Sequence, residues 1–136
     1  MKVFVDTPAF YAVFDADDED HPGGREVWGR LIHAGDQLFT SNYVLVETLA
    51  LLQSRLGIGA VRAFDDAVVP LLRMLWVGEE VRREAVSAVL TAGRRRLRLV
   101  DCSSFALVRR HGLDSAFAFD GHFSEQGFDP VPQGTP

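Results

Sequence analysis

Two short apolar segments of the sequence end directly on an aspartate. Asp6 follows "KVFV", and Asp120 follows "SAFAF". An apolar run of this length is typical of a buried strand, and a carboxylate beside it is costly unless it is paired. Either acid alone is explained equally well as a cap of the helix or turn that follows. Together they indicate a ligand site, because ligands bind at the carboxyl ends of the strands in open parallel sheets.

Two further acids stand where a carboxylate is unexpected. Glu47 lies in "YVLVETLALLQ", which has no evident polar face, so we expect it to face a metal ion or a charged site rather than bulk water. Asp101 separates "LRLV" from "CSSFALV", where it either caps a helix or joins the same site. Carboxylate oxygens are the ligands that Mg²⁺ takes in proteins, usually near phosphate. With Asp6 and Asp120, these residues predict a divalent-metal site.

The four acids are positioned by strands that alternate with helices. The predicted strands are Val3–Val5, Gln37–Thr40, Leu75–Val77 and Ala116–Phe119, with Phe128–Val131 as a candidate fifth. The predicted helices are Pro8–Phe14, Arg25–Ala34, Tyr43–Leu56, Ala60–Leu72, Glu79–Ala92 and Ser103–His111. This alternation predicts an α/β fold with a central parallel sheet of four to five strands.

Several residues mark the ends of these helices. Thr7, which precedes a proline, is a candidate N-cap of the first helix, and Ser41 or Asn42 is a candidate N-cap of the third. Pro70 should kink or end the helix that contains it, and Gly112 should close the last one.

The bulk composition is that of a globular protein. The chain has 136 residues, of which 47% are hydrophobic and 24% charged, and it shows no internal repeat. We expect a single domain over residues 1–132 and a loose tail over residues 133–136. The apolar runs are too short to span a membrane, no signal-peptide pattern is present, and Cys102 is the only cysteine. These features predict a cytoplasmic protein.

The formal charge of −5 at first argues against a nucleic-acid partner. That objection weakens if the acids hold divalent metal, since two Mg²⁺ ions would reduce the negative charge. Lys2 is the only lysine, which excludes a P-loop and most lysine chemistry. The arginine-rich segment either contacts an RNA backbone or is simply a solvated face; its arginines are Arg94, Arg95, Arg96 and Arg98.

Other features are interpreted structurally. The acidic loop before His21 resembles a calcium loop, but Asp20 stands where an EF-hand needs glycine, so we expect a solvated loop. His122 either fixes the loop after Asp120 or touches substrate, and Cys102 is expected to be a buried helix residue. The aromatic residues expected in the core are Trp28, Phe64 and Trp76.

These residues carry a family resemblance. The segments "VDTPAFYAVFD", "FTSNYVLVETLALLQSRLG" and "LVDCSSFALVRRHGLDSAFAFDGHFSEQGF" resemble the PIN-domain family, specifically its VapC-type toxin ribonucleases. The resemblance runs from about Val3 to Pro132. It implies a three-layer α/β/α fold and an acidic metal site formed by Asp6, Glu47, Asp101 and Asp120.

The resemblance also implies what the protein does. It implies a metal-dependent endoribonuclease that uses Mg²⁺ or Mn²⁺ to hydrolyse RNA, acts as the toxin of a toxin–antitoxin pair, binds a small antitoxin protein and forms a homodimer. One position departs from the pattern: Ala118 stands where many members have a threonine, so any hydrogen bond from that hydroxyl is missing.

Three other assignments compete with this one. A dehalogenase-like phosphatase needs an acid where Pro8 stands, and a response-regulator receiver needs an acid pair and a late lysine that this chain lacks. The serious alternative is a catalytically weak or inactive PIN-fold module that binds RNA or protein, for which Ala118 leaves some room. The four acids favour the nuclease.

Overall fold

The computed structural model describes residues 1–119 and 121–132. Its strands form one five-stranded sheet in the order β3-β2-β1-β4-β5, and every neighbouring pair is parallel. The strands are β1 (Lys2–Val5), β2 (Gln37–Ser41), β3 (Leu72–Leu75), β4 (Ser115–Phe117) and β5 (Pro130–Val131). The predicted parallel sheet of four to five strands is therefore confirmed.

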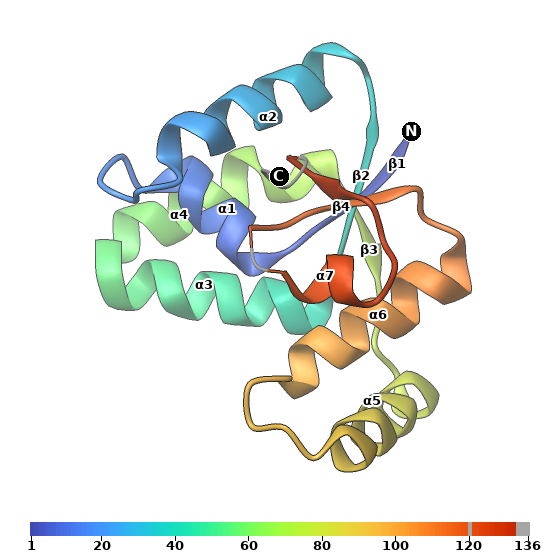
Figure 1. Cartoon of the computed structure of the whole chain (residues 1–136). Helices are drawn as coiled ribbons and strands as arrows, with labels where there is room; N and C mark the ends of the chain where they lie inside the picture. Colours follow the sequence, from blue (N-terminus) through green and yellow to red (C-terminus); the bar gives the residue numbers. More distant parts are fainter. Residues whose placement is uncertain (120, 133–136) are drawn as a thin grey trace.

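Seven α-helices and one 3₁₀ turn connect these strands. They are α1 (Thr7–Phe14), α2 (His21–His33), α3 (Asn42–Leu56), α4 (Ile58–Ala67), η1 (Val69–Leu71), α5 (Glu79–Ala92), α6 (Leu99–His111) and α7 (His122–Glu125). Figure 1 shows α1, α2 and α4 gathered on one side of the sheet and α5, α6 and α7 on the other. Helix α3 contacts both groups, through α1 and α4 and through α6. This is the expected three-layer α/β/α arrangement.

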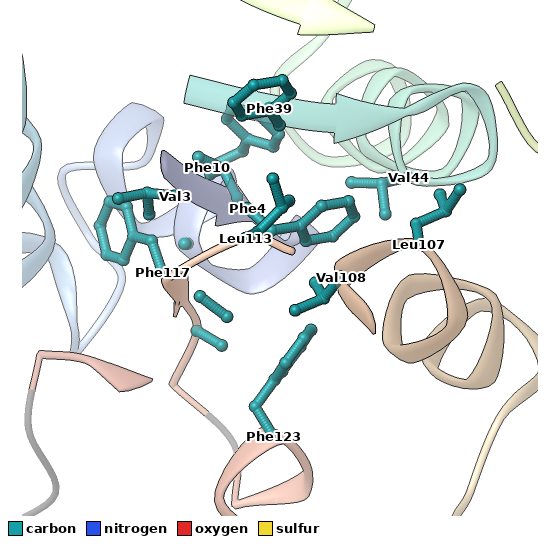
Figure 2. Packing of buried hydrophobic residues seen from close by; sticks show 14 of the residues in the cluster. Val3, Phe4, Phe10, Phe39, Val44, Leu107, Val108, Leu113, Phe117 and Phe123 are labelled. Carbon is teal, nitrogen blue, oxygen red and sulfur yellow. The ribbon is translucent and has the colours of Figure 1, made fainter. Parts of the chain in front are cut away.

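Aromatic side chains fill the core on both sides of the sheet. On one side, Phe10 of α1 packs edge-on against Phe64 of α4, with ring centroids 5.1 Å apart. On the other side, the ring centroid of Phe123 of α7 lies 6.3 Å from that of Phe4 of β1 and 5.0 Å from that of Phe105 of α6. Figure 2 shows part of this core around β1, where Val44 of α3, Leu107 of α6 and Phe123 of α7 contribute side chains. Burial of this apolar surface is the main force that holds the helices to the sheet.

The core differs from the prediction at one aromatic residue. Phe64 is fully buried and Trp28 is half-buried, but Trp76 is 71% exposed. The reason is that β3 begins at Leu72, three residues earlier than predicted, and ends at Leu75, two residues earlier, so Trp76 lies beyond the sheet. The pairing of β3 with β2 fixes this register, and no local pattern in the sequence does so.

Helix ends follow the local chemistry with small shifts. Helix α2 begins at His21 rather than Arg25, because a proline stands in its first turn and the His21 ring bonds the Ala12 carbonyl at 2.7 Å. Helix α4 ends at Ala67, five residues before the predicted Leu72, and Pro70 lies in the 3₁₀ turn η1 that follows it. Gly112 closes α6 with a φ of 59°, in the left-handed region that glycine adopts without a steric penalty.

Within the residues described, no helix is both long enough and apolar enough to cross a membrane. The tail predicted over residues 133–136 lies outside the described residues.

Candidate active site

Asp6 lies at the carboxyl end of the central strand. Its backbone N–H donates to the carbonyl of Phe117 at 3.1 Å, which ties the end of β1 to the end of β4. Its backbone carbonyl accepts hydrogen bonds from the backbone N–H groups of Ala9 at 3.1 Å and Phe10 at 3.2 Å. The N-cap residue of α1 is therefore Asp6, and not Thr7 as predicted. The residue is only 2% exposed. The sheet therefore holds this acid at the edge where ligands bind in such folds.

Asp101 reaches the site from the first turn of α6. The helix begins at Leu99, so Asp101 is its third residue rather than its N-cap. One carboxylate oxygen, Oδ2, accepts from the backbone N–H of Arg98 at 3.3 Å, which is half of a capping box. Asp101 is 3% exposed. The capping interpretation of its sequence position is therefore right in part, and its membership of a metal site stays a prediction.

Glu47 points toward the same site from the second turn of α3. Its side chain is 26% exposed, while its neighbours Val44 and Thr48 are buried. Ser41 caps this helix, its Oγ accepting from the Val44 backbone N–H at 3.1 Å. Thr48 donates to the hydroxyl of Thr7 at 3.2 Å and so links α3 to the start of α1. Glu47 therefore lies partly buried beside a charged group, and its predicted role in a metal site stays a prediction.

That charged partner is Arg98, the N-cap residue of α6. Its Nη2 donates to Glu47 Oε1 at 2.8 Å, and its Nε lies 3.8 Å from Asp101 Oδ2. The hydrogen bond to Glu47 raises the pKa of the Arg98 guanidinium, and the charges of Glu47, Asp101 and Asp6 act in the same direction. One guanidinium therefore lies among three of the predicted acids.

His122 completes this side of the site. Its Nδ1 lies 3.3 Å from Asp101 Oδ2, at the start of the short helix α7. The sequence placed His122 near Asp120, and the structure places it beside Asp101. Asp120 itself, the fourth predicted acid, lies outside the described residues.

Glu47, Arg98, Asp101 and His122 border a cleft of about 360 Å³ with mixed charge, whereas Asp6, which is almost fully buried, is not among its lining residues. Acidic lining comes from Glu47 and Asp101 and also from Asp18 and Asp20 of the loop before α2, which the sequence suggested was only solvated. Its remaining lining residues are Thr7, Pro8, Tyr11, Leu51, Arg55, Arg96, Arg98 and His122. Two of the four arginines in the arginine-rich segment thus face the cleft, whereas Arg94 pairs with Glu125 at 3.6 Å.

One hydrogen-bonded group at the rim of this cleft was not predicted from the sequence. The Tyr11 hydroxyl donates to Asp15 at 2.5 Å, and Arg55 stacks over the Tyr11 ring at 5.2 Å. This bond raises the pKa of Tyr11 and lowers that of Asp15. The only signal in the sequence was the spacing of Tyr11 and Asp15 by four residues, which is too common to be selective.

The described carboxylates do not by themselves form a ready-made ligand set. Among residues 1–119 and 121–132, no group of three or more His, Cys, Asp or Glu side chains is arranged to hold a metal ion. In this arrangement Arg98 supplies the positive charge between Glu47 and Asp101.

Cys102 is buried next to Asp101, and burial raises its pKa, which makes it unsuited to act as a nucleophile.

Known proteins are similar to this chain in sequence and in fold. The chain is 34% identical over 130 residues to proteins from two strains of Mycobacterium tuberculosis, CDC 1551 / Oshkosh and ATCC 25618 / H37Rv, each named "23S rRNA-specific endonuclease VapC20". The match covers 95% of this chain and 97% of the relative.

Solved structures also resemble this chain in fold. The crystal structure of Mycobacterium tuberculosis VapC20, described as a sarcin–ricin loop cleaving toxin, superposes with a TM-score of 0.81 at 33% identity, over 93% of this chain and 95% of that one. FitAcB from Neisseria gonorrhoeae shares the fold at 15% identity, with a TM-score of 0.70 over 94% of this chain and 95% of that one. The family model for the PIN domain matches residues 3–129, and the chain belongs to the PIN domain family.

Proposed function

We propose that this protein is a metal-dependent endoribonuclease whose active site is formed by Asp6, Glu47, Asp101 and Asp120. The observation that carries the proposal is that Glu47 of α3 and Asp101 of α6 line one mixed-charge cleft, with Asp6 at the end of β1 close enough for its charge to act on Arg98 between them. Relatives that match nearly the whole chain are named as RNA endonucleases, which supports the same activity here.

The donor chemistry fits a hard divalent cation. Asp6 and Asp101 are 2% and 3% exposed, and carboxylates buried to this degree need positive charge nearby. The cation Arg98 shows that the site accepts such a charge. We propose that Asp6 and Asp101 hold Mg²⁺ or Mn²⁺, with Glu47 and Asp120 completing the ligand set. When bound, the ion would lower the pKa of a water molecule and offset charge on the phosphate.

The residues of the chain then account for substrate binding. Arg55 and Arg96 line the cleft and present positive charge where an RNA backbone would enter. Among the described residues the cleft offers no lysine, so phosphate recognition falls to guanidinium groups, which bind phosphate oxygens in a bidentate manner. Because the VapC20 relatives are named for 23S rRNA, the first substrate to test is the sarcin–ricin loop of that RNA.

Asparagine substitutions test the catalytic assignment. Asp6→Asn and Asp101→Asn should each abolish Mn²⁺-dependent cleavage of this RNA while the circular dichroism spectrum stays that of the wild type. Asp17→Asn, in the exposed part of the acidic loop, is the matched control and should cleave normally. Cleavage that survives either active-site change, or that persists in excess EDTA, contradicts the proposal. RNA binding without any cleavage by the wild type would favour the inactive PIN-fold module.

We further propose that the protein is the toxin of a cytoplasmic toxin–antitoxin pair and acts as a homodimer. Its membership of the PIN domain family and its similarity to VapC20 support this assignment. Exposed apolar side chains beside the site also support a protein contact: Trp76 is 71% exposed and Val46 is 67% exposed. Both line a shallow, largely apolar groove that Glu47 borders.

Charge placed in this groove tests the dimer. Trp76→Glu should convert the dimer to a monomer in light scattering, because a buried unpaired carboxylate opposes association. Leu90→Glu is the control, since Leu90 is 75% exposed on α5, outside the lining of this groove. A wild-type monomer, or a Trp76→Glu protein that remains dimeric, would contradict this surface assignment.

A small protein from the neighbouring reading frame that co-purifies with the chain would support the proposal that the protein binds an antitoxin.

A further inference from the structure

Arg98 differs from an ordinary surface arginine because it contacts two acids of the proposed site. Its guanidinium donates to Glu47 at 2.8 Å and approaches Asp101 at 3.8 Å, so it contacts acids from two helices that are far apart in sequence. Its backbone N–H is also bound by the Asp101 carboxylate, at 3.3 Å. Both the main chain and the side chain of Arg98 are therefore fixed by residues proposed to bind metal.

An arginine in this position has a defined electrostatic effect. Guanidinium stays protonated at any physiological pH, so the charge that Arg98 brings to Glu47 and Asp101 is permanent. A carboxylate oxygen bonded to this group at 2.8 Å is engaged, and it must lose or weaken the bond before it ligates an ion. The Arg98 side chain is 52% exposed, so it can turn into solvent without opening the core.

We propose that Arg98 is a built-in counterion that competes with the divalent ion for the Glu47 carboxylate and thereby sets the metal concentration at which the site fills. This inference rests on the proposed function, because it assumes that the acids bind metal. Arg98 then has two effects. It stabilises the metal-free protein, and it weakens the binding of the metal ion. Arg98 is a positioning residue in this scheme, since it acts through Glu47 and Asp101.

Mn²⁺ binding to the full-length protein without RNA tests the inference. Calorimetric titration of metal-free wild type and Arg98→Gln should show a dissociation constant for Mn²⁺ about fivefold lower in the variant, the factor expected when a half-exposed ion pair no longer competes. In EDTA the same variant should melt at a lower temperature than the wild type, because Glu47 and Asp101 lose their cation. Arg98→Lys keeps the charge and should lie between the two.

Arg96→Gln is the matched control. Arg96 lines the same cleft and carries the same charge, so its loss reports the general effect of removing one positive charge there. Its dissociation constant for Mn²⁺ should change much less than that of Arg98→Gln. Equal changes in the two variants would mean that only the overall field matters, and this would overturn the inference.

The other outcomes are equally decisive. An unchanged or weaker affinity for Mn²⁺ in Arg98→Gln overturns the competition while leaving the metal site intact. A wild type that binds no Mn²⁺ overturns the proposed function itself, which keeps the two failures distinct. Should Arg98→Gln not fold, the affinity of Arg98→Lys decides, because an affinity equal to or weaker than that of the wild type contradicts the inference.

Discussion

At the scale of single residues, the site depends on small polar side chains as much as on its acids. Ser41 is the clearest case, because it is fully buried at the junction of β2 and α3 and accepts from the Val44 backbone N–H at 3.1 Å. That bond fixes where α3 begins, and therefore where Glu47, five residues after Asn42, meets the cleft. The acid and its placement are thus encoded by different residues.

Ser41→Ala should lower the free energy of unfolding by about 1 kcal/mol, because the Val44 N–H loses its partner in a buried place. Urea denaturation measures the change. Ser54→Ala, on the exposed side of the same helix, is the control and should be neutral or slightly stabilising. Equal stability of the Ser41 variant and the wild type would show that the cap contributes nothing.

At the scale of elements, α5 shows how a helix start is stabilised by charge. Glu79 is the first residue of α5, where a negative charge interacts favourably with the helix dipole. Its carboxylate also accepts from Arg82 at 2.6 Å and from Arg83 at 3.0 Å. The hydrogen bond from Arg82, followed by that from Arg83, lowers the pKa of Glu79 from 4.5 to about 2. This helix matched its predicted bounds, Glu79 to Ala92.

Glu79→Gln should therefore remove a stabilising effect that depends on pH. A folded-state pKa below the unfolded value means that the contribution is present above pH 4.5 and is lost as the pH falls toward 2. The wild type should be the more stable protein at pH 7, and the difference should shrink progressively on acidification. Unfolding by urea at several pH values measures it. A difference that is constant with pH would contradict the shifted pKa.

At the scale of the whole molecule, the net negative charge of the chain is consistent with the proposed metal site. The chain carries a formal charge of −5, and the charges of Asp6, Glu47 and Asp101 all act on Arg98. A cation that binds the folded protein and not the unfolded chain raises the stability of the entire fold. Metal binding is therefore measurable without RNA and without catalysis.

Mn²⁺ at about 100 times its dissociation constant should raise the free energy of unfolding by about 2.7 kcal/mol, which appears as a melting temperature several degrees higher. Asp6→Asn should lose most of this gain, because it removes one proposed ligand. Glu19→Gln, in the exposed acidic loop, should keep it. The same gain in all three proteins would indicate nonspecific binding and contradict the site.

Local chemistry explains which parts of the fold were predictable. The ends of α3 and α6 followed from Ser41 and Gly112, whose capping roles are set by their own residue types. The position of β3 was wrong by about three residues, because its apolar side chains fit several registers and only pairing with β2 selects one. Trp76 was placed in the core for the same reason, although it is 71% exposed.

The sequence by itself determined the fold class and which acids could serve a metal site. Alternation of strands and helices requires a parallel sheet, and an acid that follows a buried strand must arrive at its carboxyl edge. Only the tertiary structure decided what those acids meet. Arg98 lies 51 residues after Glu47 in sequence, and nothing local predicts their ion pair. The packing of α3 against α6 brings them to 2.8 Å and turns a basic segment into the counterion of the site.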